Sequence, residues 1–515
     1  MAEEKSISIS FNKVSVDADS KKKEKLISLV FDKKRNIFLS GPGGVGKTYN
    51  IKNYIQPEAI KRGKILHITS TTGVSALSIG GTTIHRWAGI KIGKESAITI
   101  FNRLKLYNRE CCKRWEETDV LVIDEISMLG AKIFELLDKV GQLLCDNTLP
   151  FGGKSLIVSG DFLQLPPVND SFVFTSSVWD EMNFRVVRLT EPKRYPDLSH
   201  FELLMRVRMA RHTKEDVKTL YKRVEAYIDY IRKGGDKNEK IKPTKLFSLK
   251  KDVAQHNLDE LAKLDGETVI YNAVDKFITK SELKNMEKES VSDRMIKKNN
   301  KDKISGKDIM EYTEFLDTVI DRQIYLKPGA QVILTYNLSV ELGLLNGSRG
   351  VALHCDPDGV LVLFKNGVTM RILLNAYEFE DGNVKLIRYQ IPLILAWAIS
   401  IHKSQSLTLD YVIMDLGPSL FAPGMAYVAL SRVRTLDGLL LSSFAPNKIT
   451  ADPEAVRFEQ TIIDEEKNED EEEDDVKDEG EENKEGEKGD DGEEEDEGRE
   501  EGEKGDEDSD EPGSN

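Results

Sequence analysis

The sequence predicts an α/β fold in which parallel strands alternate with crossover helices. Four short apolar runs in the first third of the chain are each bounded by turn or helix signals, as expected of single buried strands. A glycine-rich loop follows the first of these runs, and a pair of acids follows the third. Alternation of this kind is typical of a parallel sheet covered by helices. The four runs are Ile37–Leu39, Lys64–Thr69, Val120–Ile123 and Leu156–Val158.

Length and composition are those of a globular protein. The chain has 515 residues, of which 39% are apolar, and this length favours about three domains. No stretch approaches the roughly 20 consecutive apolar residues of a membrane-spanning helix. Residues Met1–Ser10 lack the pattern of a signal or transit peptide. We therefore expect a soluble intracellular protein without a membrane partner, in the nucleus or cytoplasm.

The four cysteines form no paired C-x-x-C pattern, and we interpret them as ordinary reduced thiols.

Charge is distributed unevenly along the chain. Residues 464–515 hold 31 acidic and 6 basic residues, a net charge of −25. Residues 1–463 hold 58 acidic and 67 basic residues, a net charge of +9. A basic body suits a polyanionic partner. The acidic tail cannot bury a core and is expected to be disordered. It either solubilises the protein, or competes for the protein's own binding channel or docks a basic protein partner.

The second half of the chain changes character twice. Residues 191–264 look mostly helical, with one strand candidate at Lys245–Ser248. Lysine- and asparagine-rich stretches at Gly234–Lys245 and Lys280–Lys307 are interpreted as loops or insertions. In the segment 326–388, Asn366-Gly367 and Asp381-Gly382 each lie between strand-like runs. These hairpin signals predict a small antiparallel barrel.

The glycine-rich loop matches the phosphate-binding pattern G-x-x-x-x-G-K-[ST], after a strand and before a helix. Glycines let backbone N–H groups turn inward around phosphate oxygens, and the following helix N-terminus adds positive partial charge. Lys47 is expected to reach the outer phosphates, and the Thr48 hydroxyl to bind Mg²⁺. The alternative, a chance glycine-rich turn, is disfavoured by the fixed Lys-Thr. The predicted loop residues are Gly41, Pro42, Gly43, Gly44, Val45, Gly46, Lys47 and Thr48.

The acidic pair Asp124 and Glu125 closes the third strand run. An acid at this position can hold Mg²⁺ through water, and the next acid can act as the general base for the attacking water. The alternative is that both acids cap a helix that begins near Ser127. Together with the glycine loop, the pair predicts a nucleoside triphosphatase, but the two motifs alone do not separate a helicase from a clamp loader or a kinase.

Further segments resemble the PIF (petite integration frequency) helicases of superfamily 1, which are related to RecD-type helicases. The resemblance extends from about Asn36 to Phe444. It rests on Thr69–Ala76, Gly80–Gly89, Asp124–Met128, Pro150–Lys154, Gly160–Val168, Leu326–Val332, Leu345–Gly350, Gln390–Ala398, Ile401–Gln405 and Ala426–Arg432.

The resemblance implies two RecA-like domains with ATP between them. The first would span residues 1–190 and carry a short wedge between His85 and Asp119. The second would span 191–325 and 389–450, interrupted by an SH3-like barrel at 326–388 and followed by the acidic tail at 464–515. Such a protein would be an ATP- and Mg²⁺-dependent DNA helicase. It would act as a monomer, move 5′ to 3′ on single-stranded DNA and unwind forked DNA.

The resemblance also implies roles for single residues. Gln164 would sense the γ-phosphate, and Arg432 and Arg194 would stabilise charge on the transferring phosphoryl group. For both arginines the alternative is a surface salt bridge. Eight residues lie in segments that contact DNA in relatives, although His85 and Phe162 would also suit a core and Lys403 a solvated surface. They are Thr69, Thr71, His85, Phe162, Pro166, His402, Lys403 and Gln405.

Three departures from the family pattern bear on these expectations. Residues 20–24 lack the upstream glutamine that reads adenine, which leaves strict ATP preference open. Ser406 stands where glycine is usual, and Tyr195 where glutamine is usual. Three other functions also remain open: an RNA-directed or RecD-like helicase, a translocase that strips proteins without unwinding, and a non-enzymatic scaffold. The full set of catalytic residues argues against the scaffold.

Overall fold

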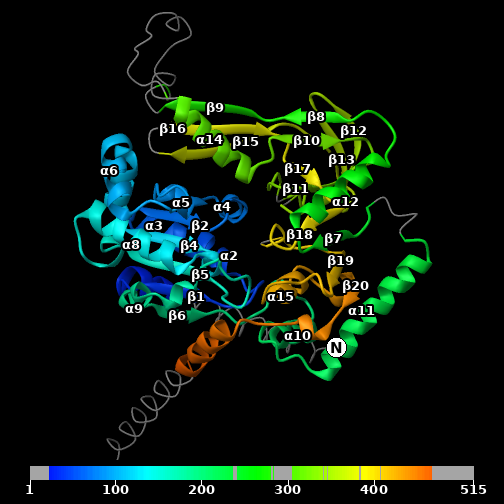
Figure 1. Ribbon diagram of the computed structural model, residues 1–515, viewed down its shortest axis with the longest axis horizontal. Coiled ribbons are helices and arrows are strands. Elements are labelled where there is room, and N and C mark those ends of the chain that lie inside the picture. The colour runs from blue at the N-terminus through cyan, green and yellow to red at the C-terminus, as the bar shows by residue number, and fades with distance from the viewer. Residues whose placement is uncertain are drawn as a thin grey trace, which may run out of the picture. The chain divides into compact units, whose positions relative to one another are not determined.

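A six-stranded sheet organises the N-terminal part of the computed structural model (Figure 1). The strand order is β3-β2-β4-β5-β1-β6, and all neighbours are parallel. The sheet contains all four predicted apolar runs, so the α/β prediction is confirmed. The strands are β1 (Ile37–Ser40), β2 (Leu66–Ser70), β3 (Thr82–Thr83), β4 (Val120–Asp124), β5 (Ser155–Gly160) and β6 (Arg185–Arg188).

The structure describes residues 23–466, except for 236–240, 280–281, 283–303, 305, 340, 345, 382–383 and 406. The chain divides into one unit up to Arg457 and another from Phe458 onward, and the sheets and sites considered below belong to the first. Nearly all of the predicted acidic tail, and most of the lysine-rich stretch 280–307, lie outside the described residues. Within the part that is described, no helix combines the length and apolarity required to cross a membrane.

Helices of the N-terminal part connect and cover the strands of this sheet. The region of the predicted wedge contains α6 and α7, whose capping residues Ser96 and Asn108 each accept a backbone N–H through a side-chain oxygen. Trp115 on α7 packs on Trp87 of α5 with ring centroids 4.6 Å apart, which holds the two helices together. The helices are η1 (Ser28–Asp32), α2 (Lys47–Asn50), η2 (Ile51–Ile55), α3 (Gln56–Lys61), α4 (Gly73–Ile79), α5 (Ile84–Trp87), α6 (Ala97–Tyr107), α7 (Arg109–Glu117), η3 (Ile126–Met128), α8 (Ala131–Cys145), η4 (Pro150–Gly152), η5 (Val173–Thr175) and α9 (Ser177–Met182).

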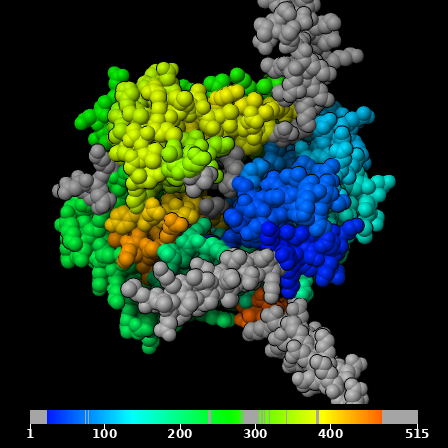
Figure 2. Space-filling model, turned by 180° about the vertical axis from the view of Figure 1, so that it is seen from behind, coloured from blue at the N-terminus to red at the C-terminus, as the bar shows by residue number. Residues whose placement is uncertain are grey.

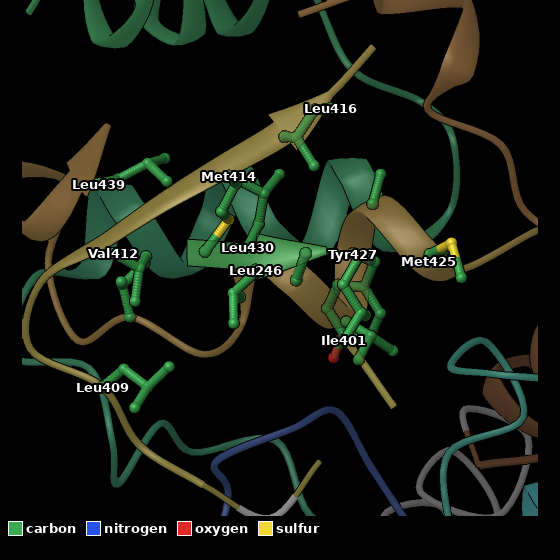
Figure 3. Close-up of a cluster of buried hydrophobic side chains, with 14 of the residues drawn as sticks. Leu246, Ile401, Leu409, Val412, Met414, Leu416, Met425, Tyr427, Leu430 and Leu439 are labelled. Atoms are coloured by element: carbon green, nitrogen blue, oxygen red, sulfur yellow. The ribbon is translucent and has the colours of Figure 1, made fainter. Parts of the chain in front are cut away.

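A second parallel sheet, in the order β18-β7-β19-β20, forms later in the chain. Helix α15 is buried at all six positions and packs in its apolar core (Figure 3). The strand predicted near residue 245 and the helices predicted around it are confirmed. The elements are β7 (Thr244–Phe247), β18 (Ala398–Ser400), β19 (Val412–Leu416), β20 (Leu439–Phe444), α10 (Leu198–Arg208), α11 (Lys214–Arg232), α12 (Lys250–Ala262), α15 (Met425–Leu430), η6 (Leu436–Gly438) and η7 (Pro446–Lys448).

The intervening segment is antiparallel, as the hairpin signals predict. It comprises a five-stranded sheet in the order β14-β13-β12-β11-β17, a three-stranded sheet β15-β16-β9, and the pair β10-β8. In Figure 2 its yellow surface lies beside the orange surface of the second parallel sheet. The strands are β8 (Val269–Asn272), β9 (Val274–Thr279), β10 (Gln323–Leu326), β11 (Gln331–Leu334), β12 (Arg349–Asp356), β13 (Gly359–Phe364), β14 (Thr369–Ile372), β15 (Asn375–Asp381), β16 (Val384–Gln390) and β17 (Leu393–Leu395).

The predicted start of this insert at residue 326 differs from the observed strand pairing. That boundary leaves β8 and β9 in the second α/β domain, yet β9 pairs with β16 along its whole length and β8 pairs with β10. Helix α14 (Gly306–Val319) also packs on the β15-β16-β9 sheet through Leu316. Among the strand pairings of the described residues, none closes these sheets into a barrel.

Arg388 joins α14 to the three-stranded sheet. Its side chain is fully buried on β16, and its guanidinium makes a two-pronged contact with the Asp275 carboxylate on β9 at 2.7 Å. The same group lies 2.7 Å from Asp317 on α14 and donates to the backbone oxygen of Ile320 at 2.7 Å. A buried cation held by two acids stabilises the fold only while all its partners remain in place.

We predict that Arg388→Met destabilises the protein by about 3 kcal/mol, because Asp275 and Asp317 lose their counter-charge while the aliphatic packing is kept. Chemical denaturation would measure the change in the free energy of unfolding. Arg371→Met is the control, since one guanidinium nitrogen of Arg371 donates to both Asp356 carboxylate oxygens at the surface, and its loss should cost far less. Equal losses in the two variants would contradict the role given to Arg388.

Candidate active site

The glycine loop connects β1 to α2 with backbone angles that need glycine. Gly44 and Gly46 have φ of 89° and 94°, in the left-handed region that disfavours side chains. A Cβ at Gly44 would lie 2.8 Å from the Arg194 Cβ, and one at Gly41 would lie 2.3 Å from the Leu189 oxygen. Close packing therefore requires glycine at Gly41 and Gly44, and the torsion angles require it at Gly44 and Gly46.

Lys47 and Thr48 begin α2 directly after the loop. The Lys47 ammonium donates to the backbone oxygens of Gly41 and Pro42 at 2.7 and 3.0 Å, so it lies across the mouth of the loop. Burial lowers the pKa of Lys47, and the nearby Asp161, Glu125 and Asp124 oppose that change. The lysine thus lies partly buried among acids that keep it charged, which suits a cation that binds phosphate.

The two acids at the end of β4 lie beside this lysine. The Thr48 hydroxyl donates to the Asp124 carboxylate at 3.1 Å. Burial raises the pKa of Asp124, and the charge of Lys47 opposes the rise. Glu125 has a left-handed backbone with φ of 55°, and its side chain makes no capping hydrogen bond to η3, so the capping alternative is not supported for this acid. The Thr48 hydroxyl and Asp124 carboxylate are oxygen ligands of the kind that fit Mg²⁺.

Gln164 and both predicted arginines line the same cleft as Lys47, Thr48, Asp124 and Glu125. The cleft has a volume of about 690 Å³ and lies between the two parallel sheets, with loops of the insert along its rim. The structure therefore brings together the predicted catalytic groups, although they come from distant parts of the sequence.

Arg432 follows α15 and is buried. It donates to the backbone oxygens of Val428 and Ser404 and to the Ser431 hydroxyl. Burial and the neighbouring Arg194 lower the pKa of Arg432 to about 10, so the guanidinium is still charged at neutral pH. Arg194 donates to the Ser431 oxygen at 2.9 Å. Both arginines thus reach the cleft beside the Ser431 turn.

Three further residues join this site that are not among the predicted site residues. Asp161 follows β5, Arg208 ends α10, and Tyr427 lies on α15. Arg208 donates to both Asp161 carboxylate oxygens at 2.8–3.2 Å, and the Tyr427 hydroxyl donates to the same carboxylate at 3.2 Å. Asp161 and Tyr427 stand inside the strings that carry the family resemblance, whereas nothing in the sequence marks Arg208.

The predicted DNA-contacting residues fall into two groups by exposure. Thr71, His85, Pro166, His402 and Lys403 are partly or largely exposed, whereas Thr69, Phe162 and Gln405 are buried. Burial lowers the pKa values of His85 and His402, which favours neutral imidazoles.

The three buried side chains differ in their surroundings. Thr69 donates to the Val122 oxygen inside the sheet at 2.6 Å. Phe162 packs on Phe38, Phe172, Phe174 and Trp179, so the structure places it in the core. The Gln405 amide nitrogen is buried with no hydrogen-bond partner among the described residues, which leaves a donor near Lys403. Thr69 and Phe162 therefore offer no side-chain surface to a DNA strand in this structure.

The departures from the family pattern have partly visible consequences. Tyr195 packs in the core of the second sheet, and its hydroxyl donates to the Ser431 oxygen at 3.0 Å. It thus shares an acceptor with Arg194 and supports the turn that carries Arg432. Ser406 lies outside the described residues, as do the first three of residues 20–24.

Comparison with known proteins shows which family the chain resembles. A family model described as PIF1-like helicase matches residues 16–242, and a second, DNA helicase Pif1, 2B domain, matches residues 316–354. The ATP-dependent DNA helicase PIF1 of Xenopus laevis is 36% identical over 82% of this chain and 61% of its own length. Protein 030L of Invertebrate iridescent virus 6 is 30% identical over 83% of this chain and 91% of its own length.

Solved structures show the same fold. The Pif1 helicase of Candida albicans is 29% identical, with a TM-score of 0.65 over 86% of this chain and 98% of its own. Pif1 from a Bacteroides species in complex with ADP-AlF4 gives a TM-score of 0.66 at 26% identity, over 86% of this chain and 97% of its own. The chain spans about three fifths of the length of the vertebrate PIF1 relatives. With these matches across both parallel sheets, the chain belongs to the PIF1-like helicase family.

Proposed function

We propose that this protein is an ATP-dependent DNA helicase that moves along single-stranded DNA and separates duplex strands at forks. The observation that carries the proposal is the cleft itself, where the phosphate loop and acids of one parallel sheet face Arg432 of the other, with Arg194 beside the loop. Each parallel sheet and the helices packed on it form one lobe of the cleft. An active site assembled from two lobes converts a change at the nucleotide into relative movement of the lobes. Relatives that resemble this chain are named as ATP-dependent DNA helicases.

Each group has a role that follows from its place. The loop amides and Lys47 hold the phosphates, and Glu125 accepts a proton from the attacking water. Gln164 orients that water, while Arg432 and Arg194 stabilise the charge that develops on the transferred phosphoryl group. Mg²⁺ held by Thr48 and Asp124 would supply further charge neutralisation. Because Arg432 comes from the second lobe, hydrolysis requires that lobe to close on the first.

The DNA partner is proposed from the exposed candidates and the charge of the body. Lys403 suits phosphate oxygens, and His85, Pro166 and His402 offer ring faces for bases. Bacteroides Pif1, a structural neighbour of this chain, has been solved bound to ssDNA. These features together favour a single strand of DNA as the track.

Thr71 offers a short path between the DNA and the nucleotide. Its hydroxyl donates to the backbone oxygen of Glu125 at 2.9 Å. A DNA strand that contacts Thr71 would therefore lie next to the backbone of Glu125, the proposed general base. This contact supports a turnover rate that depends on bound DNA.

ATP turnover by the purified protein should rise strongly on addition of single-stranded DNA. In Glu125→Gln we expect turnover to fall by about 10²–10⁴-fold, because the general base is lost while the phosphate contacts remain. Steady-state hydrolysis would measure this, with ATP binding followed separately. Glu58→Gln is the control, since Glu58 pairs with Arg62 at the end of α3, away from the cleft. Turnover unaffected by Glu125→Gln would refute the site assignment. Stimulation of turnover by RNA but not by DNA would show that the nucleic-acid partner is RNA.

The direction of travel is proposed as 5′ to 3′, on the strength of the family resemblance. Forked duplexes that carry a single-stranded tail of only one polarity would test it. We expect strand separation in the presence of ATP when the tail is 5′, and little when it is 3′. Unwinding that needs a 3′ tail would overturn the direction. Displacement of a bound protein without any strand separation would favour a stripping translocase.

A further inference from the structure

One buried carboxylate is shared by both lobes of the cleft. Asp161 follows β5 of the first sheet, and its exposed fraction is 1%. From its own lobe it accepts a hydrogen bond from the Leu163 amide at 3.1 Å and a longer one from Gln164 at 3.4 Å. From the other lobe it accepts hydrogen bonds from the Arg208 guanidinium and from the Tyr427 hydroxyl. Burial raises the pKa of Asp161. The positive charges of Arg208 and Lys47 outweigh this effect and hold the pKa below its usual value, so the carboxylate stays charged.

Tyr427 extends this network to the phosphate loop. Its ring packs in the core of the second sheet on α15 (Figure 3), with an exposed fraction of 1%. The hydroxyl accepts the backbone N–H of Gly43 at 2.8 Å while it donates to Asp161. Burial and the charge of Asp161 raise the pKa of Tyr427 well above its usual value, so the hydroxyl keeps the proton that it donates.

The network connects the groups that handle phosphate on both sides of the cleft. Gly43 lies in the loop, and Gln164 shares the Asp161 carboxylate with Tyr427. Arg432 donates to the backbone oxygen of Val428, the residue after Tyr427, at 2.8 Å. A shift of α15 against the first sheet would therefore disturb the loop, the water-orienting glutamine and the arginine together.

We propose that Tyr427 is a positioning residue. Its hydroxyl, held by Asp161 and Arg208, fixes the positions of the glycine loop and Gln164 relative to Arg432. This inference rests on the proposed ATPase function. The hydroxyl bonds to the loop backbone and to Asp161, and it acts on the reaction only through them. It defines how the second lobe sits on the phosphate loop, and so it matters most in the closed arrangement that stabilises the transition state.

Tyr427→Phe keeps the ring and its packing but removes both hydrogen bonds of the hydroxyl. We expect kcat for ATP to fall about tenfold with KM changed less than about twofold, because the lost contact acts in the transition state. The affinity for ADP with aluminium fluoride, relative to ADP alone, should fall by about the same factor. Steady-state kinetics and calorimetric titration of the full chain would give these values.

Tyr271→Phe is the matched control. Its hydroxyl is also buried and donates to the backbone oxygens of Asp356 and Gly359, but within the insert. This variant should lower the melting temperature and leave the ratio of the two affinities unchanged. If Tyr427→Phe also only lowers the melting temperature, with kcat and the ratio as in the wild type, the positioning role is wrong.

A second variant covers the case in which Tyr427→Phe fails to fold. Arg208→Lys keeps the buried positive charge but loses the fork that grips both Asp161 oxygens, and it should shift kcat and the affinity ratio in the same direction. A normal ratio in this variant would overturn the proposal. If the wild type itself turns over no ATP, the proposed function fails; if it does and the variants behave as the wild type, the positioning role alone fails.

Discussion

The ion pair between Asp161 and Arg208 is the contact on which the rest of the site depends. A buried carboxylate is costly unless it is paired and fully hydrogen-bonded. Asp161 meets that condition only with donors from both lobes, since Arg208 and Tyr427 pack with the second sheet. The requirement to satisfy one buried charge thus joins the two lobes at the phosphate loop in the arrangement seen here.

The two sheets that meet at this ion pair supply different groups to the cleft. The first sheet presents Lys47, Thr48, Asp124 and Glu125 at the carboxyl ends of its strands, where loops and helix N-termini converge. The second presents Arg432 at the end of α15. Neither sheet alone holds a complete set of groups for phosphoryl transfer. Under the proposed function, chemistry at the nucleotide would depend on the relative position of the lobes, as a motor requires.

Local features of this fold were predictable from the sequence, whereas tertiary ones were not. The parallel strands, the glycine loop and the acidic pair are each encoded in a few adjacent residues. The insert boundary at residue 326 misses β9 because the pairing of β9 with β16 joins residues about a hundred positions apart. Arg208 carries no motif, and only the folded chain brings it to Asp161. Thr69 and Phe162 were candidates for DNA contact because the resemblance conveys the place of their segments in the chain but not the burial of their side chains.

The affinity for single-stranded DNA in two nucleotide states tests the coupling of the lobes most directly. Fluorescence anisotropy of a labelled oligonucleotide, at fixed salt, would compare the protein saturated with ADP and with ADP plus aluminium fluoride. If lobe closure couples the nucleotide to DNA grip, the two affinities should differ by about fivefold or more. Equal affinities, with both nucleotides shown to be bound, would contradict a motor driven by closure of these lobes.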